Sequence, residues 1–319
     1  MPSQTVGNVH INAPLTNLAR LYRPRGFIAD QVCPMLPVVK ESDLYYVFDQ
    51  GPFFATDVED LVPDRGKPRK VEFSHTTEQY SCQKRELAWD ISDRERSNAD
   101  NQLNLERNKQ AGTLGRLLLK REVRVAAALR KTTNGGGLTL GAAALAKWDA
   151  ATTDYQDLAT DVMAGKTAIR QAIGATPNVV VIPAAVAEGM HKSLLFQALQ
   201  YTYGDVRARN LIEQEYPVLP NVLFGMRVIV GGELKNTAKE GQVASYSDVW
   251  GEAVRMLYVT EGPALEEPSV AYSFASRQLQ TRQWRDEEAE VDSFAVGFIL
   301  DDAKIVAPSA GYEIDDCLT

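Results

Sequence analysis

The apolar residues between positions 100 and 130 recur with the period of a helix. This segment has no proline and is rich in good helix formers. We predict one long helix of roughly 45 Å at 1.5 Å per residue, which Gly112 and Gly115 could bend. A rod with one apolar stripe needs an extended surface to pack against. The stripe consists of Leu114, Leu117, Leu118, Val125, Ala128 and Leu129.

A second side of this predicted helix is basic. Lys109, Arg116, Lys120, Arg124 and Lys131 also recur at helical spacing. Residues 93–131 contain ten basic and five acidic residues, a net charge of +5, although the whole chain has a net charge of −8. The stripe is either an ordinary solvated face or a surface for non-specific contact with phosphates. No aromatic residues are interleaved with it, so stacking on single strands is not indicated.

The chain before the helix lacks a core of its own. Residues 1–26 are polar and read as an arm, either disordered or ordered on a neighbour, while residues 27–39 are more apolar. Residues 44–48 and 71–75 have strand patterns and flank a charged tip. A two-stranded hairpin is marginal alone, so we predict that this loop lies on another subunit. The basic residues of its tip are Arg65, Lys67, Arg69 and Lys70.

The chain after the helix alternates between helical and strand patterns. Residues 154–174 form a predicted amphipathic helix, and residues 178–183 are a continuous apolar run typical of a buried strand. Residues 151–250 therefore read as an α/β unit inserted into a β-rich part, which gives an α+β fold class. The further predicted helices are 184–200 and 205–214, and the further predicted strands are 222–230, 254–260, 270–275, 277–284, 291–300, 301–306 and 311–314.

The sequence offers little for catalysis. Ala164-Gly165-Lys166-Thr167 is similar to part of a phosphate-binding loop, but Thr160 stands where that motif needs glycine, and the surrounding pattern is helical. The glycine cluster 135–137 reads as a turn. His10, His75 and His191 are isolated, whereas a histidine site needs partners in the right geometry. The acidic run 286–290 reads as a solvated strand end or an intersubunit ion-pair partner.

The cysteines and the lengths of the apolar runs narrow the class of protein further. Cys33, Cys82 and Cys317 are odd in number and widely spaced, which predicts free thiols in a reducing cytoplasm. There is no apolar run of signal-peptide or membrane-span length. We therefore expect no catalytic, cofactor-binding or metal site, no enzyme activity, and no membrane partner.

The order of these elements resembles the major capsid proteins of tailed bacteriophages. That family has an N-terminal arm, an extended β loop, a long spine helix, a peripheral β-rich domain and an inserted axial α/β domain. The resemblance covers the chain from about residue 27 to its end. The segments that carry it are residues 33–38, 45–49, 248–251 with Tyr258, 267–274, and 302–306 with residues 311–312.

The resemblance implies a domain division and a set of partners. The arm would be residues 1–36, the extended loop 37–92, the spine helix 93–150, the axial domain 151–253 and the peripheral strands 254–319. Copies would join as pentamers and hexamers into an icosahedral shell around double-stranded DNA, with assembly in the host cytoplasm. A scaffolding protein, a portal and a decoration protein would be further partners. The stripe Lys109, Arg116, Lys120 and Arg124 would face the DNA.

Three alternatives stay open at this stage. An encapsulin-like compartment would keep the fold but enclose a cargo enzyme instead of DNA. Another virion component, such as a tail or decoration protein, would also be structural. An α/β enzyme centred on residues 151–250 would need a pocket with a strongly perturbed carboxylate or histidine pair.

Overall fold

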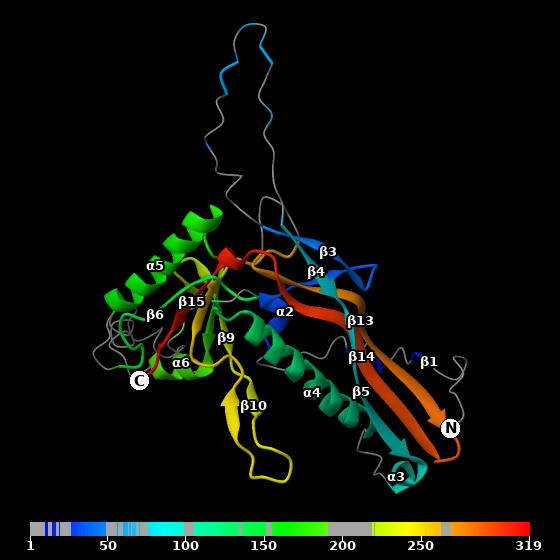
Figure 1. Ribbon diagram of the computed structural model, residues 1–319. Coiled ribbons are helices and arrows are strands. Elements are labelled where there is room, and N and C mark those ends of the chain that lie inside the picture. Colours follow the sequence, from blue (N-terminus) through cyan, green and yellow to red (C-terminus); the bar gives the residue numbers. More distant parts are fainter. Residues whose placement is uncertain are drawn as a thin grey trace.

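The described residues form two large sheets, with a long helix packed beside them, and two two-stranded hairpins (Figure 1). The computed structural model describes residues 10–11, 15–16, 19, 27–48, 56, 60–62, 64, 66–67, 70, 76–98, 105–133, 136–150, 155–190, 219, 221–262 and 269–319. The two halves of the molecule are a peripheral half around the long hairpin β13–β14 and an axial half around helix α5 (Figure 1). None of the described helices is both long and apolar enough to span a membrane.

The peripheral sheet has the strand order β1-β13-β14-β5, with β2 also paired to β13. The predicted strands 270–275 and 277–284 are one strand, which continues through a register irregularity between Ala275 and Arg277. The antiparallel pair β13–β14 dominates the sheet, and the acidic run forms the exposed turn at its end. The bounds are β1 His10–Ile11, β2 Met35–Pro37, β5 Gln83–Ser92, β13 Ala271–Asp286 and β14 Val291–Ile305.

The predicted long helix is present in the described part of the chain. Helix α4 spans Leu105–Ala128, roughly 36 Å at 1.5 Å per residue. It is continuous through both glycines, and a short helix, α3 (Asp93–Asn98), precedes it. Its apolar stripe packs against the peripheral sheet, where Leu114 and Leu117 are buried in one cluster with the stacked rings of Trp89 and Phe294. The predicted extended packing surface is therefore the sheet of the same chain.

The axial sheet has the order β6-β15-β12-β7-β9-β8. Helix α5 (Tyr155–Ile173) covers it, and its buried residues include Leu158, Val162, Ile169 and Ile173, as the predicted amphipathic pattern required. Helix α6 (Ala184–Gly189) follows β7. The predicted helix 205–214 and the rest of 184–200 lie outside the described residues. The strand bounds are β6 Leu140–Ala143, β7 Val179–Pro183, β8 Val222–Leu223, β9 Met226–Gly231, β12 Val254–Leu257 and β15 Gly311–Asp315.

The strands after residue 253 do not all belong to the peripheral sheet, contrary to our expectation. Strands β12 and β15 pair with each other in the axial sheet, between β6 and β7. The reason is burial: β12 is buried along its whole length, and its Arg255 donates from Nε to Glu313 of β15 at 3.0 Å. A buried guanidinium needs such a partner, and here the neighbouring strand β15 supplies it.

Two hairpins extend from this body. The first joins β3 (Ser42–Val47) to β4 (Thr76–Ser81), and its root packs on β13 through Tyr45, Tyr80 and Phe274. The second joins β10 (Leu234–Asn236) to β11 (Tyr246–Asp248) and leaves the axial half at its lower edge in Figure 1. The second predicted loop strand, residues 71–75, lies outside the described residues.

Candidate functional site

The charged residues of α4 are divided between two faces. One face is buried against the peripheral sheet and helix α2 (Ala29–Val32), and the other is open to solvent. Lys120 is exposed, whereas the next residue, Arg121, is only 2% exposed. The positive charge that the sequence places on this helix is therefore not all surface charge.

On the buried face, Arg121 joins three elements. Its Nε donates to Asp302 of β14 at 3.1 Å, and its Nη1 donates to Asp30 of α2 at 2.5 Å. Arg124 Nε donates to the second oxygen of Asp302 at 2.6 Å. Burial alone would lower the pKa of Arg121, but the two carboxylates outweigh burial and hold that pKa above its usual value. This network of ion pairs ties α4 to α2 and to β14 of the same chain.

Glu122 ties the same helix to the axial half. Its carboxylate accepts from the backbone N–H groups of Ile28 at 3.1 Å and Ala29 at 3.0 Å, and from Nε1 of Trp250 at 2.8 Å. Burial raises the pKa of Glu122, although these three donors favour the ionised form. The Glu122 side chain thus accepts hydrogen bonds both from the backbone at the start of α2 and from the Trp250 indole, which precedes β12.

The open face of α4 retains only part of the predicted basic stripe. Arg116 and Lys120 are exposed and make no ion pair with any residue of the described part of the chain. Lys109 is instead bonded to the carbonyl oxygen of Asp90 and to Glu95, at 2.9 and 2.7 Å. Arg124 is paired with Asp302 as described. Within the described part of the chain, two of the four predicted residues, Arg116 and Lys120, are therefore available for a ligand without breaking an ion pair.

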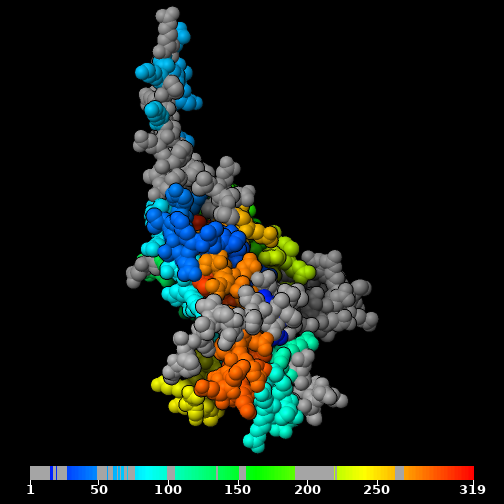
Figure 2. Space-filling view, turned by 90° about the vertical axis from the view of Figure 1, so that its right-hand side faces the viewer, coloured from blue at the N-terminus to red at the C-terminus, as the bar shows by residue number. Residues whose placement is uncertain are grey.

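The predicted loop tip projects from the body. The described residues between 56 and 70, drawn in blue, stand clear of both sheets in two views (Figures 1 and 2). Lys67 and Lys70 are exposed, as are Leu61 at 79% and Val62 at 41%. The other two predicted tip residues, Arg65 and Arg69, lie outside the described residues. Exposed apolar side chains on such a projection are typical of a surface that a partner covers.

The described part of the N-terminal arm behaves differently from the loop. Strand β1 pairs with β13 of the same chain. The Thr281 backbone N–H donates to Thr16 Oγ1 at 3.0 Å, and Gln110 Nε2 of α4 donates to the Leu15 carbonyl at 2.6 Å. Our prediction that the arm is either disordered or lies on a neighbour is therefore wrong for these residues. The reason is that β13 offers them a free edge and a buried polar site.

The rejected catalytic motifs have structural roles. Ala164-Gly165-Lys166-Thr167 lies inside α5, where a Cβ on Gly165 would come within 2.0 Å of Met256, so this glycine permits helix and sheet to approach closely. Lys166 donates to the Phe224 carbonyl at 2.7 Å. His10 lies in the two-residue strand β1, and His75 and His191 lie outside the described residues. Within the described ranges, no group of side chains could hold a metal ion.

The buried network of α4 was missed by our sequence reasoning, although a signal was present. Arg121 and Glu122 fall in the same helical phase as Leu114, Leu117 and Val125, which we assigned to the apolar stripe. Charged residues in an apolar phase are buried only when paired, so they implied partners elsewhere. Only the tertiary structure shows that those partners are Asp302 and Asp30.

Two sequence comparisons agree on one family. The sequence model of a family described as phage capsid protein matches residues 76–304. The major capsid protein of Pseudomonas phage JBD67 is 27% identical over 252 residues, which cover 78% of this chain and 77% of that protein.

Solved structures share the fold. A phage-related protein from Bordetella bronchiseptica RB50 has a TM-score of 0.67 at 20% identity and covers 96% of this chain and 97% of its own. The mature capsid of bacteriophage PhiM1 has a TM-score of 0.54 at 10% identity, covering 92% and 87%. At these identities the structural likeness establishes the fold, a tailed-phage capsid fold.

Proposed function

The chain belongs to the phage capsid protein family and is a major capsid protein, and we propose from this premise how its copies assemble and what they enclose. Rings of five and six copies join into a closed icosahedral shell around double-stranded DNA. Such a shell needs contacts that each copy both gives and receives. The observation that supports this best is the loop between β3 and β4, whose described residues stand clear of their own chain and carry exposed apolar side chains.

The loop would lie across a neighbouring copy. Obligate interfaces typically bury more than about 2,000 Å², which offsets the entropy lost when a segment without a core becomes ordered. Its basic tip, Arg65, Lys67, Arg69 and Lys70, would face acidic residues of that neighbour, because the rest of the chain is acidic. The exposed acidic turn 286–290 is one surface with the required charge.

The open face of α4 would face packaged DNA. Arg116 and Lys120 support this role, since they are exposed and lack an acidic partner among the described residues. Lys109 and Arg124, which belong to the same predicted stripe, would contribute little because their charges are already paired. Contact with phosphates needs no base-reading groups, so binding would be independent of DNA sequence.

The remaining assignments follow from the shell. The arm 1–36, loop 37–92, spine 93–150 and axial part 151–253 are proposed as assembly units, with β12 and β15 added to the axial part and β13 and β14 forming the peripheral part. A scaffolding protein, a portal and a decoration protein would be the other partners, with assembly in the host cytoplasm. The role is structural, and no catalytic step is proposed.

Electron microscopy of the purified full chain, alone and with its co-expressed phage assembly proteins, tests the proposal. We expect closed shells, and we expect shells from infected cells to contain DNA. Tubes or small monomers under every condition would contradict a shell protein, and shells filled with a cargo enzyme would indicate an encapsulin-like compartment instead. A double variant, Lys67→Glu with Lys70→Glu, should reduce shell yield, whereas Arg227→Glu, an exposed cation on β9, should not.

A further inference from the structure

The hairpin β10–β11 carries a concentration of exposed apolar side chains. Leu234 is 52% exposed and Tyr246 is 68% exposed, and Val243 in the connecting turn is 92% exposed. Leu234 pairs with Asp248 and Asn236 with Tyr246, so Leu234 and Tyr246 lie on the same face of the hairpin. We call this hairpin, residues 234–248, the finger. The face that carries Leu234 and Tyr246 also carries Asn236 and Asp248. Its exposed apolar side chains are of the kind that a partner covers.

The finger is held in one shape before any partner arrives. The side-chain oxygen of Asn236 accepts from the backbone N–H groups of Ala238 at 2.9 Å and Ser245 at 3.1 Å. The Thr237 N–H donates to the Ser245 carbonyl at 2.8 Å. At the base, Val249 and Trp250 are buried in the main core. A two-stranded hairpin is marginal in water by itself, and this one is braced at both ends.

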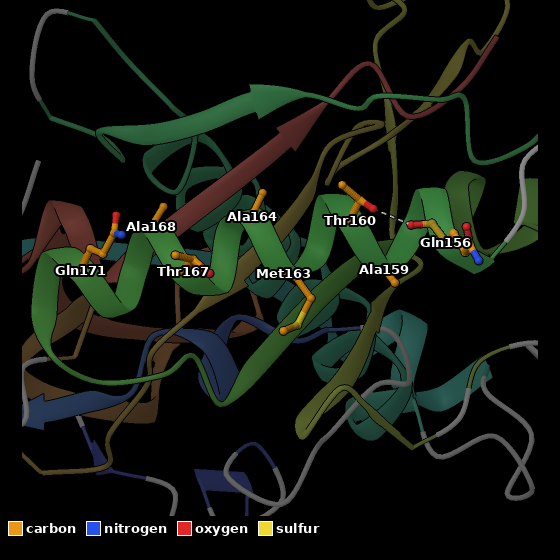
Figure 3. Close-up of a pocket in the computed structure, with 8 residues that line it drawn as sticks. All are labelled: Gln156, Ala159, Thr160, Met163, Ala164, Thr167, Ala168 and Gln171. Atoms are coloured by element: carbon orange, nitrogen blue, oxygen red, sulfur yellow. Dashed lines mark hydrogen bonds between the residues drawn. The ribbon is translucent and has the colours of Figure 1, made fainter.

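The opposite edge of the axial half has a complementary surface. A hollow of about 740 Å³ runs along the outer face of α5. The described residues that line it are uncharged and all come from α5, where they recur every three or four positions (Figure 3). Met163 is 51% exposed there, beside small side chains such as Ala164 and Thr167. No charged side chain among them would have to lose its water when an apolar group binds.

We propose that the finger of one copy docks on the α5 hollow of the next copy in the ring. The inference rests on the proposed shell. A ring of identical chains closes through head-to-tail contacts only if each chain has two different, matching surfaces. The α5 helix and the finger lie on opposite edges of the axial half (Figure 1), so one copy can give a finger to one neighbour and receive one from the other. Leu234 and Tyr246 supply the apolar face, and the small, uncharged α5 residues receive it.

Disulfide trapping in assembled particles tests the contact directly. Val243→Cys is combined in one chain with Thr160→Cys, Ala164→Cys or Thr167→Cys, which follow one another along α5. A disulfide needs Cα atoms within about 7 Å, and the two sites lie on opposite edges of one chain, so each bond must join two copies. The three native cysteines are buried. The matched control replaces Val243→Cys by Val222→Cys, since Val222 on β8 is also an exposed valine, at 59%.

The size of the trapped products decides the outcome. A head-to-tail contact predicts a ladder in non-reducing gels that ends at five and six copies for at least one α5 position, with no ladder in the control. Dimers alone, or dimers from Val243→Cys without its partner, would indicate a two-fold contact and overturn the inference. Intact shells without cross-links at all three positions would also overturn it while leaving the shell itself standing. Failure of the unmodified chain to form shells would instead contradict the proposed function.

Charge insertion gives an independent readout. Tyr246→Asp and Ala164→Glu each place a charge in the proposed contact, and we expect shell yield to fall at least tenfold while the circular dichroism spectrum stays unchanged. Arg170→Glu changes the charge on α5 outside the hollow, and we expect it to assemble normally. Normal assembly of both contact variants would overturn the inference.

Discussion

On one face of α4 the charged side chains are buried and paired, whereas on the other they lie in solvent. Arg121 and Lys120 are adjacent in sequence, yet Arg121 joins Asp30 and Asp302 while Lys120 has no ion-pair partner in the described structure. Buried ion pairs contribute little net stability but are costly to break, and surface charges contribute little either way. The buried charges therefore hold α4 in place within the fold, whereas the exposed charges can contact a ligand without disturbing the fold.

The largest effect should come from removing the shared carboxylate of the buried face. Asp302→Ala leaves Arg124 without its partner and Arg121 with Asp30 alone. Breaking a buried pair costs about 3–5 kcal/mol, which urea denaturation of the unassembled chain would measure. Asp43→Ala, which breaks the exposed pair with Lys40, is the control and should leave the midpoint unchanged. Equal effects of the two variants would remove the distinction between the faces.

A slightly smaller effect is expected at Glu122. Glu122→Ala leaves three buried donors without an acceptor. At about 1 kcal/mol each, the lower end of the cost of an unsatisfied donor, the free energy of unfolding should fall by about 3 kcal/mol. Glu122→Gln can keep the bonds that Oε1 accepts from Ile28 and Trp250 but not the bond from Ala29. Its loss should therefore be clearly smaller in the same urea titration. A glutamine variant as unstable as the alanine variant would show that the negative charge, not the acceptors, is required.

The next smaller effect should be a pH dependence of the free energy of unfolding, caused by buried thiols. Cys33 contacts Ser273 at 3.3 Å near Arg121, and burial raises the pKa of its thiol to about 11. Burial also raises the pKa of Cys317 to about 12. Above pH 9 the unfolded chain releases protons that the folded chain keeps, so the free energy of unfolding falls as pH rises, by up to about 1.4 kcal/mol per pH unit for each thiol. Cys33→Ala should flatten this slope, and an unchanged slope would contradict the assignment.

The smallest effect on stability is expected on the open face. Arg116→Glu with Lys120→Glu should leave the urea midpoint unchanged because both side chains are exposed. The same variant should weaken duplex DNA binding and reduce the slope of log affinity against log salt concentration by about 2, since two phosphate contacts are lost. Arg227→Glu is the matched control. An unchanged salt slope in the double variant would remove DNA contact from this face.

For the arm and the loop, the sequence pattern did not predict whether the segment packs on its own chain or on another copy. Neither has a hydrophobic core of its own, although the loop has strand patterns on both sides of its tip, and we expected both to depend on neighbours. The described arm residues instead bond to β13 and α4 of their own chain, while the described loop residues stand clear. A segment without a core has no pattern that says whether its partner is its own chain or another.

The sequence by itself determined the local elements whose period is set by one buried face. Helix α5, strand β7 and the sheet-facing stripe of α4 follow from apolar spacing, because the spacing of side chains on a helix or strand is fixed by backbone geometry. The order of these elements also pointed to the family. Only the tertiary structure decided which charges are buried, that β12 and β15 complete the axial sheet, and that the finger and the α5 hollow lie on opposite edges. Each of these depends on contacts between residues far apart in sequence, for which no local spacing carries a signal.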